Sequence, residues 1–167
     1  VVPVIAAIRA RLPVPVSVDT SKPEVMRAAV AAGAGLINDV RALQQPGALE
    51  SAAALGVPVC LKHMQGQPDT MQQGPCYVDV VAEVAAFLSA RMAACMAAGI
   101  PVGHILLDPG FGFGKTLTHN LMLLARLRDI AALGPPLLVG LSRKSMLGAI
   151  TGRPVTERLA GSLAAAL

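Results

Sequence analysis

The sequence predicts an α/β fold built around a parallel sheet, and three observations support that prediction. Short apolar runs alternate along the chain with longer segments of helical periodicity. The short runs are apolar at consecutive positions, as in strands that helices cover on both faces. Polar side chains follow each run, at the end where parallel strands present residues to a ligand. The alternation covers all 167 residues without linkers, which predicts a single domain, residues 1–167.

Five strands are predicted from the apolar runs. These are Val14–Asp19, Leu36–Val40, Val57–His63, His104–Asp108 and Pro136–Leu141. Each run is five to seven residues long and is bounded by residues typical of turns.

Six helical segments alternate with the strands. A partial helix, Val4–Leu12, precedes the first strand. The next begins at Ser21 and ends at Gly33, and Ser21 and Glu24 have the spacing of a capping box. A third runs from about Pro46 to Gly56.

The remaining helices are predicted from their apolar faces. The clearest has Val80, Val84, Phe87, Leu88 and Cys95 on one face and is closed by Gly99. Another begins near Thr118, with Leu121, Leu124 and Leu127 as its core face, and the last begins near Thr156. Five strand–helix units fit either an open doubly wound sheet or part of an eight-stranded barrel, and periodicity does not choose between them.

Composition excludes several classes of function. The net charge is +4, but basic residues are scattered and the chain has one Tyr, three Phe and no Trp, so nucleic-acid binding is not predicted. Three cysteines without metal-ligand spacing predict reduced thiols in a cytoplasmic protein. The longest charge-free run, Met92–Leu107, is interrupted by glycine and proline and predicts no membrane span.

The stretch LLDPGFGFGKT, Leu106–Thr116, resembles a phosphate-binding loop at first sight. Such a loop needs glycine where this chain has Pro109, which lacks an N–H and has a fixed φ. Asp108 at the strand end would also repel a phosphate. The stretch is therefore interpreted as a different kind of ligand site.

Polar side chains follow all five predicted strands. They are Asp19-Thr20, Asn38-Asp39, His63-Met64-Gln65, Asp108 and Ser142-Arg143-Lys144. Each has a structural interpretation as a cap, a turn or a solvated side chain. Their coincidence at five strand ends favours a shared small-molecule site, because burying such groups is costly unless a ligand pairs with them. Lys115 and Arg143 are assigned no role.

Five stretches occur in the order and at the spacing of the dihydropteroate synthases, and the chain resembles that family throughout. They are SVDTSKPEV, LINDVRAL, LKHMQGQPDTM, LLDPGFGFGKTLTHN and LVGLSRKS. The resemblance implies a (β/α)8 TIM barrel, of which these residues would form about strands three to seven. It also implies that p-aminobenzoate displaces diphosphate from 6-hydroxymethyl-7,8-dihydropterin diphosphate, assisted by Mg²⁺.

The resemblance also implies roles for particular residues. Asp108 would accept hydrogen bonds from the pterin amino and ring N–H groups. Asn38 would both donate to and accept from the adjacent ring atoms, and Lys144 would donate to the pterin carbonyl and ring nitrogen. Asp19 would stabilise positive charge that grows on the methylene group as diphosphate leaves. Asp19 and Lys144 are thus the expected catalytic residues.

Four further residues complete the expected site. Met64, Phe113 and Gly140 would form a flat slot for the pterin ring. Ser145, at the start of a helix, would contact the carboxylate of p-aminobenzoate, the part of the site that sulfonamide inhibitors would occupy.

The chain departs from the family pattern at both ends. Two first strands, with an Asn that helps bind Mg²⁺, and a last strand with a diphosphate site are not among these residues. We therefore expect the metal ligand to lie outside this chain and residues 1–167 alone to be inactive, with a homodimer as the full-length form. The alternatives are the pterin-binding domain of a methyltetrahydrofolate–corrinoid methyltransferase, against which SRKS argues, an inactive fragment, and an unrelated small α/β binding module.

Overall fold

The structure, a computed structural model, describes residues 1–67 and 69–167 and contains two compact units. Unit 1 comprises Val1–Lys62 and Leu88–Leu107, and unit 2 comprises His63–Phe87 and Asp108–Leu167. Pro68, within the stretch LKHMQGQPDTM, lies outside the described residues. The single domain predicted from the sequence stays a prediction.

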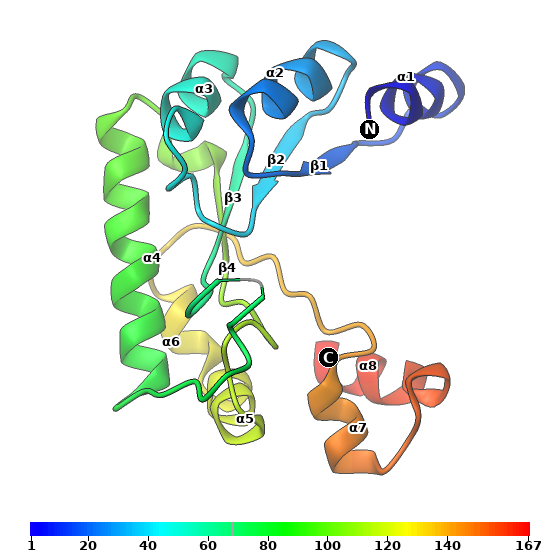
Figure 1. Cartoon of the computed structure of the whole chain (residues 1–167), viewed down its shortest axis with the longest axis vertical. Helices are drawn as coiled ribbons and strands as arrows, with labels where there is room; N and C mark the ends of the chain where they lie inside the picture. The colour runs from blue at the N-terminus through cyan, green and yellow to red at the C-terminus, as the bar shows by residue number, and fades with distance from the viewer. Residues whose placement is uncertain (68) are drawn as a thin grey trace. The chain divides into compact units, whose positions relative to one another are not determined.

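A four-stranded sheet in the order β1-β2-β3-β4 confirms four of the five predicted strands (Figure 1). The strands are β1 (Ser17–Asp19), β2 (Leu36–Asp39), β3 (Val59–Lys62) and β4 (Ile105–Asp108). β1 pairs with β2 and β2 with β3 in parallel, which places Asp19 opposite Asn38. All four residues of β3 are buried, as the continuous apolar run predicts.

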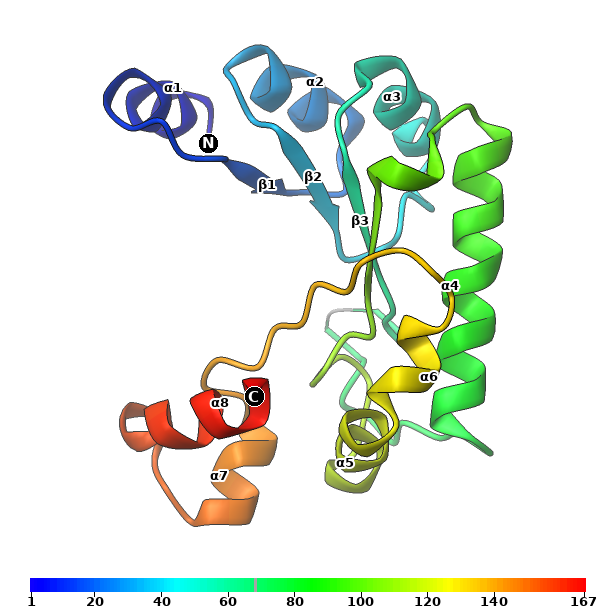
Figure 2. The ribbon, with the colours of Figure 1, turned by 180° about the vertical axis from the view of Figure 1, so that it is seen from behind.

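Three helices belong to the first part of unit 1, and Figures 1 and 2 show them in a row beside β1–β3. They are α1 (Val2–Arg11), α2 (Pro23–Ala31) and α3 (Ala48–Leu55), of which α2 contacts α3. Left-handed glycines, Gly33 (φ 106°) and Gly56 (φ 65°), follow α2 and α3 as predicted.

The capping box predicted at the start of α2 is wrong. Lys22 is the N-cap residue, Pro23 occupies the first turn, and no side chain caps the helix. Proline suits this position because its missing N–H has no intrahelical acceptor there. The Ser21 hydroxyl is used elsewhere, since it donates to a carboxylate oxygen of Asp39.

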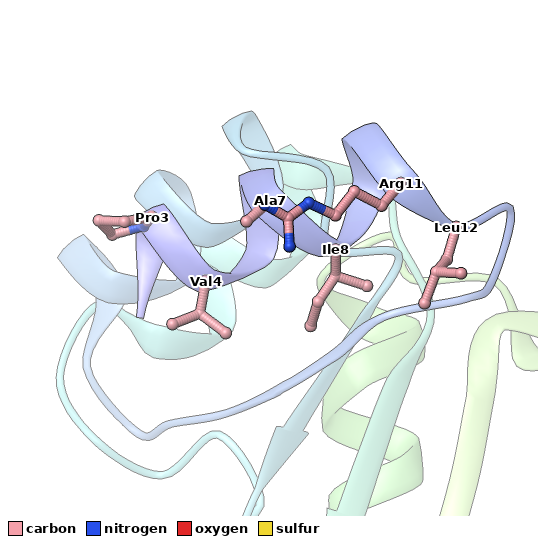
Figure 3. A pocket seen from close by; sticks show the side chains of 6 residues that line it. All are labelled: Pro3, Val4, Ala7, Ile8, Arg11 and Leu12. Carbon is pink, nitrogen blue, oxygen red and sulfur yellow. The ribbon is translucent and has the colours of Figure 1, made fainter.

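The core of unit 1 lies between the sheet and its helices. Its members are fully buried apolar side chains, among them Val18, Met26, Ala29, Ile37, Val59, Leu61 and Ile105. The outer face of α1 is different, because it forms a shallow hollow of about 390 Å³ lined by Pro3, Val4, Ala7, Ile8, Arg11 and Leu12 (Figure 3). No residue that the sequence analysis assigned to a site lines this hollow.

Helix α4 (Val80–Ala97) confirms the predicted apolar face, with Val80, Val84, Leu88 and Cys95 buried and Phe87 half-buried. By length and composition it is the one described helix apolar enough to cross a membrane, a criterion that core helices of soluble proteins also meet. The cysteines are free thiols, and two of the three are buried.

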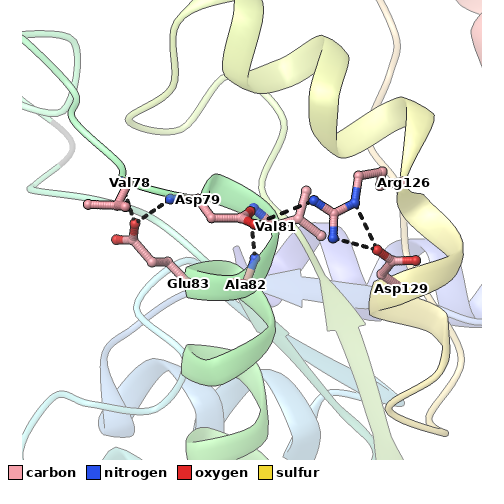
Figure 4. Close-up of polar contacts among 7 residues, drawn as sticks. All are labelled: Val78, Asp79, Val81, Ala82, Glu83, Arg126 and Asp129. Carbon is pink, nitrogen blue, oxygen red and sulfur yellow. Dashed lines mark hydrogen bonds and ion pairs between the residues drawn. The ribbon is translucent and has the colours of Figure 1, made fainter.

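Unit 2 caps the start of α4 with a polar network that sequence reasoning missed (Figure 4). Asp79 Oδ1 accepts the N–H groups of Val81 and Ala82 at 2.9 and 3.1 Å, and Glu83 Oε1 accepts those of Val78 and Asp79. Arg126 joins Asp79 to Asp129 through exposed ion pairs. Asp79, directly before α4, thus caps the helix, and Glu83 accepts backbone N–H groups from one residue beyond the position that a capping box uses.

The helix predicted near Thr118 is present but its core face is not the predicted one. It breaks at Arg126 into α5 (Leu117–Ala125) and α6 (Leu127–Ala131). Leu121 is exposed and Leu124 and Leu127 are half-buried, whereas Asn120, Leu123 and Ile130 are buried. The apolar pattern misled because the buried face carries a polar residue, Asn120, whose amide binds backbone groups.

The fifth predicted strand, Pro136–Leu141, is wrong, since a single bridge residue, Leu137, is the only strand-like pairing there. Pro135 and Pro136 lack N–H groups and cannot donate to a ladder at the start of the segment. The chain ends in α7 (Ser145–Thr151), a 3₁₀ turn (Val155–Glu157) and α8 (Leu159–Ala166), so the helix predicted from Thr156 begins three residues later. A second 3₁₀ turn, Val102–His104, precedes β4.

Candidate functional site

In unit 1, Asp19 and Asn38 lie side by side where β1 and β2 end. The strand register pairs the two residues, and Asn38 Nδ2 donates to Asp19 Oδ2 at 3.0 Å. Asp19 is exposed, while the buried Asn38 Oδ1 has no hydrogen-bond partner within the described part of the chain. A buried acceptor without a partner is costly, and it is the kind of group that a ligand N–H can satisfy.

Asp39, the next residue along β2, points the other way and is fully buried. Its carboxylate accepts the N–H groups of Arg41 and Leu43, each at 2.9 Å, in addition to the Ser21 hydroxyl. The two neighbouring residues therefore have different roles. Asn38 lies at the strand-end surface, and Asp39 organises the turn that follows β2.

The loop that Asp39 organises has an unusual backbone. Ala42 and Leu43 both adopt left-handed conformations, with φ of 50° and 60°, although neither is glycine. Arg91 stabilises this turn from α4, because its Nε donates to Ala42 O at 2.8 Å and its Nη2 to Leu43 O at 3.3 Å. The turn is thus held by an anion that accepts its N–H groups and a cation that donates to its carbonyl groups.

In unit 2, Asp108 ends β4 and begins a glycine-rich loop, residues 108–115, which we call the DPG loop. Asp108 is 3% exposed, and its Oδ1 accepts the N–H of Gly110 at 2.7 Å. Its backbone carbonyl accepts the N–H of His63 at 2.9 Å, which fixes the start of the loop beside the end of β3.

The glycines of the DPG loop are required by its close approach to residues 63–65. Gly110 and Gly114 have positive φ, and a Cβ at these positions would lie 1.9 Å from His63 O and 2.4 Å from Gln65 O. The structure shows that Gly110 and Gly114 make room for the protein's own backbone.

Lys115 and His63 form a buried pair beneath this loop. Lys115 Nζ lies 2.9 Å from His63 Nδ1, and it donates to the carbonyl oxygens of Gly110 and Phe113, each at 3.0 Å. The His63 ring packs edge-on against Phe87, with ring centroids 5.0 Å apart.

Burial controls the charges of the pair. It lowers the pKa of Lys115 to about 7, while the negative charge of Asp108 opposes that shift and the positive charge of Lys144 adds to it. Burial, and then the positive charge of Lys115, lower the pKa of His63 to about 3. His63 is therefore neutral at pH 7, and its Nδ1 accepts the hydrogen bond.

Phe113 and Lys144 come together, as the sequence analysis expected of site residues. Lys144 Nζ lies 4.9 Å from the centre of the Phe113 ring, within the range of a cation–π contact. Lys144 is the N-cap residue of α7 and Ser145 is its first residue, so Ser145 does begin a helix.

The other predicted site residues are less enclosed. Met64 is half-buried just after β3, and Gly140 and Ser145 are exposed. The structure thus groups Asp19 with Asn38 in unit 1, and Asp108, Phe113 and Lys144 around Lys115 in unit 2. Sequence reasoning placed Asp39 and His63 among the polar residues at the strand ends without giving either a role of its own, and it left Lys115 undecided.

Comparisons with known proteins agree on one family. The profile of the family described as "Pterin binding enzyme" matches residues 1–167. The chain is 56% identical over its whole length to the dihydropteroate synthase of Escherichia coli K12 and 53% identical to that of Haemophilus influenzae. It spans 59% and 61% of the length of these relatives.

Solved structures give the same result. A Yersinia pestis dihydropteroate synthase with a sulfonamide drug complex superposes with a TM-score of 0.97 at 52% identity, over 99% of this chain and 61% of that one. A Xanthomonas albilineans dihydropteroate synthase in complex with 7,8-dihydropteroate gives a TM-score of 0.93 at 54% identity, over 99% and 61%. These neighbours are TIM barrels, of which the present chain is a portion, so the barrel prediction is confirmed and the open doubly wound sheet is not.

Proposed function

Because this chain belongs to the family of pterin-binding enzymes, we propose that it is part of a dihydropteroate synthase. The proposed reaction joins the amine of p-aminobenzoate to the methylene carbon of 6-hydroxymethyl-7,8-dihydropterin diphosphate and releases diphosphate. The observation that carries the proposal is the buried Asp108 at a strand end, beside Lys115 and near Lys144, in a chain 56% identical to a dihydropteroate synthase. Relatives with sulfonamide, 4-aminobenzoic acid and 7,8-dihydropteroate support the same substrates.

Asp108 and Asn38 are the proposed readers of the pterin edge. A pterin presents amino and ring N–H donors next to acceptors, so it needs both kinds of partner. The Asp108 carboxylate would accept the donors in charge-assisted bonds. Asn38 Oδ1, buried and without a partner in the described residues, is suited to accept one further N–H.

Asp19 and Lys144 are the proposed catalytic residues. As diphosphate departs, positive charge develops on the methylene carbon, and the Asp19 carboxylate would stabilise it. Asn38 holds Asp19 Oδ2 at 3.0 Å and so limits its movement. Lys144 would donate to the pterin carbonyl and ring nitrogen from its position over Phe113.

The remaining contacts concern the ring faces and the second substrate. Phe113, Met64 and Gly140 would form the slot for the flat ring, and Phe113 already has a cation on its face. Ser145, exposed in the first turn of α7, would bind the carboxylate of p-aminobenzoate, and sulfonamides would compete there.

The residues present do not fit the magnesium ion that the family resemblance implies. Among the described residues, no group of three His, Cys, Asp or Glu side chains is placed to hold a metal ion. The metal would have to be held by residues outside this chain, and no step above depends on it. We further propose a cytoplasmic homodimer, supported by the free thiols and by Leu159 and Leu163 of α8, which are 71% and 58% exposed.

The methyltransferase alternative has no support, because the relatives described above are dihydropteroate synthases.

Replacing Asp108 with Asn in the full-length protein tests the proposal. The change keeps the size of the side chain but replaces one carboxylate oxygen with an NH2 group, which would face the N–H donors of the ligand. Pterin affinity should therefore fall by about 2–4 kcal/mol. Isothermal titration calorimetry with a dihydropterin measures this, and Asp129→Asn, an exposed residue of the α6 ion pair, is the matched control. Equal pterin affinity in the Asp108 variant and the wild type would remove Asp108 from the site.

A further inference from the structure

We propose that Lys115 is the positioning residue that holds the DPG loop against residues 63–65 and so sets Asp108 and Phe113 in place for the ligand. The identity of that ligand as a pterin rests on the proposed function. The contacts that Lys115 makes within the protein do not.

The Lys115 ammonium uses all its hydrogen-bond donors within the protein. A lysine ammonium has three N–H donors, and Lys115 has three acceptors within 3.0 Å: His63 Nδ1, Gly110 O and Phe113 O. The side chain is only 4% exposed. All its donors are used inside the protein, so its role is to hold the loop and not to contact a substrate.

The DPG loop is held in place mainly by side chains. Side chains of unit 2 supply most of its hydrogen bonds, among them Asn120 of α5, which accepts the Gly112 N–H at 2.8 Å and donates to Lys115 O at 3.3 Å. Gln72 Nε2 donates to Gly112 O at 2.7 Å and Tyr77 Oη to Gly114 O at 2.8 Å, while Lys115 Nζ donates to Gly110 O and Phe113 O. Lys115 is the one donor among these that binds the loop at two points and also binds the end of β3.

Charged and titratable groups surround Lys115. The groups that face Lys115 are the neutral His63, the carboxylate of Asp108 and the ammonium of Lys144, and Tyr77 lies beyond the His63 ring. The pKa of His63 is about 3 and that of Tyr77 about 12, so neither titrates near neutrality. The pKa of Lys115 is about 7, which makes it the group that changes charge there.

The sign of the pH effect follows from the number of N–H groups. Below pH 7 the ammonium serves all three acceptors. Above pH 7 the neutral amine has two N–H groups and turns a lone pair toward the third acceptor, so the loop loosens and affinity for a pterin should fall. The contribution of Lys115 to the free energy of unfolding should instead rise with pH. Between pH 7 and 10.5 the unfolded chain binds more protons at Lys115 than the folded chain does.

The test uses the full-length protein with Lys115→Met, which keeps the length of the side chain and removes its donors. Lys22→Met, at an exposed lysine of unit 1, is the matched control. Amide hydrogen exchange of residues 110–114 in the free protein reports the loop, and calorimetry with a dihydropterin at pH 6 and pH 8 reports binding.

We expect Lys115→Met to speed exchange in residues 110–114 at least tenfold, with β1 and β2 unchanged. Pterin affinity at pH 6 should fall about tenfold, and the weakening that the wild type shows between pH 6 and 8 should disappear. Lys22→Met should behave as the wild type in all three respects.

Unchanged exchange in the Lys115 variant overturns the proposal, and so does faster exchange with unchanged pterin affinity, which would make Lys115 a purely structural anchor. If the wild type binds no pterin, the proposed function fails while the exchange measurement still shows whether Lys115 holds the loop. If Lys115→Met does not fold, the wild-type binding profile decides: constant affinity from pH 6 to 8 overturns the proposal.

Discussion

The two strand-end regions of this protein are built around buried charges of opposite sign. In unit 1, the anion Asp39 collects donors: the Ser21 hydroxyl and the N–H groups of Arg41 and Leu43. In unit 2, the cation Lys115 collects acceptors: the imidazole of His63 and the carbonyls of Gly110 and Phe113. Asp39 follows Asn38 on β2 and holds the turn after that strand, whereas Lys115 holds the loop that carries Asp108 and Phe113.

The backbone explains the difference in sign. After β2 the chain turns through the left-handed Ala42 and Leu43 and presents N–H groups inward, which an anion satisfies. After β4 the positive φ angles of Gly110, Gly112 and Gly114 turn carbonyl groups toward the protein, which donors satisfy. A buried charge in either place is tolerable because each of its bonds replaces one lost with water.

The largest effect should come from Asp39→Ala. Three donors would lose their acceptor in a region where Asp39 itself is fully buried. Each unsatisfied buried group costs about 1–3 kcal/mol, so the free energy of unfolding should fall by about 3–5 kcal/mol. Urea unfolding of the full-length protein measures it. A loss below about 1 kcal/mol would mean that water replaces the carboxylate and that the two regions are not built alike.

Gly110→Ala should have the next largest effect, because unit 2 depends on close backbone contact as well as on Lys115. Its Cβ would lie 1.9 Å from His63 O, at a φ of 71°, so the loop must move away from residues 63–65. We expect a loss of about 2–4 kcal/mol in the free energy of unfolding.

Gly112→Ala is the matched control for Gly110→Ala. It has the same kind of backbone, with φ of 82°, but its Cβ would meet only the flexible side chain of Lys144, at 3.6 Å. The expected loss is about 1 kcal/mol, the cost of the backbone conformation alone. Equal losses in the two variants would show that the contact with His63 is not what fixes the loop.

Much of this arrangement could be predicted from the sequence, and the failures have identifiable causes. Strands β1–β4 and the polar residues after them follow from continuous apolar runs and from the parallel topology. Asp39 was also within reach, because alternation along β2 puts it on the opposite side from Asn38. Lys115 was not, because its role depends on carbonyl groups whose direction is set by glycine backbone angles.

Two wrong predictions, the core face of α5 and the capping box at Ser21, have the same cause, because both overlooked polar groups that the chain buries. The core face of α5 was assigned to Leu121 and its neighbours because buried helix faces are expected to be apolar. Asn120 takes that face, since it accepts the N–H of Gly112 at 2.8 Å and donates to Thr116 O at 2.7 Å. The capping box at Ser21 failed likewise, because Asp39 competes for the hydroxyl. Local patterns do not include partners that tertiary structure supplies.

The smallest effect should come from an exposed ion pair, which separates the role of charge from the role of burial. Arg153 Nη1 and Glu157 Oε2 lie 2.9 Å apart, as close as the bonds of Lys115, but their side chains are 65% and 53% exposed. Water screens such a pair and already solvates both groups, so Glu157→Gln should change the free energy of unfolding by less than about 0.5 kcal/mol. Urea unfolding at 0.1 M and 1 M NaCl checks this, and even that small difference should disappear at the higher salt concentration. A loss as large as that of Asp39→Ala would show that charge pairing alone, and not the satisfaction of buried backbone groups, stabilises these loops.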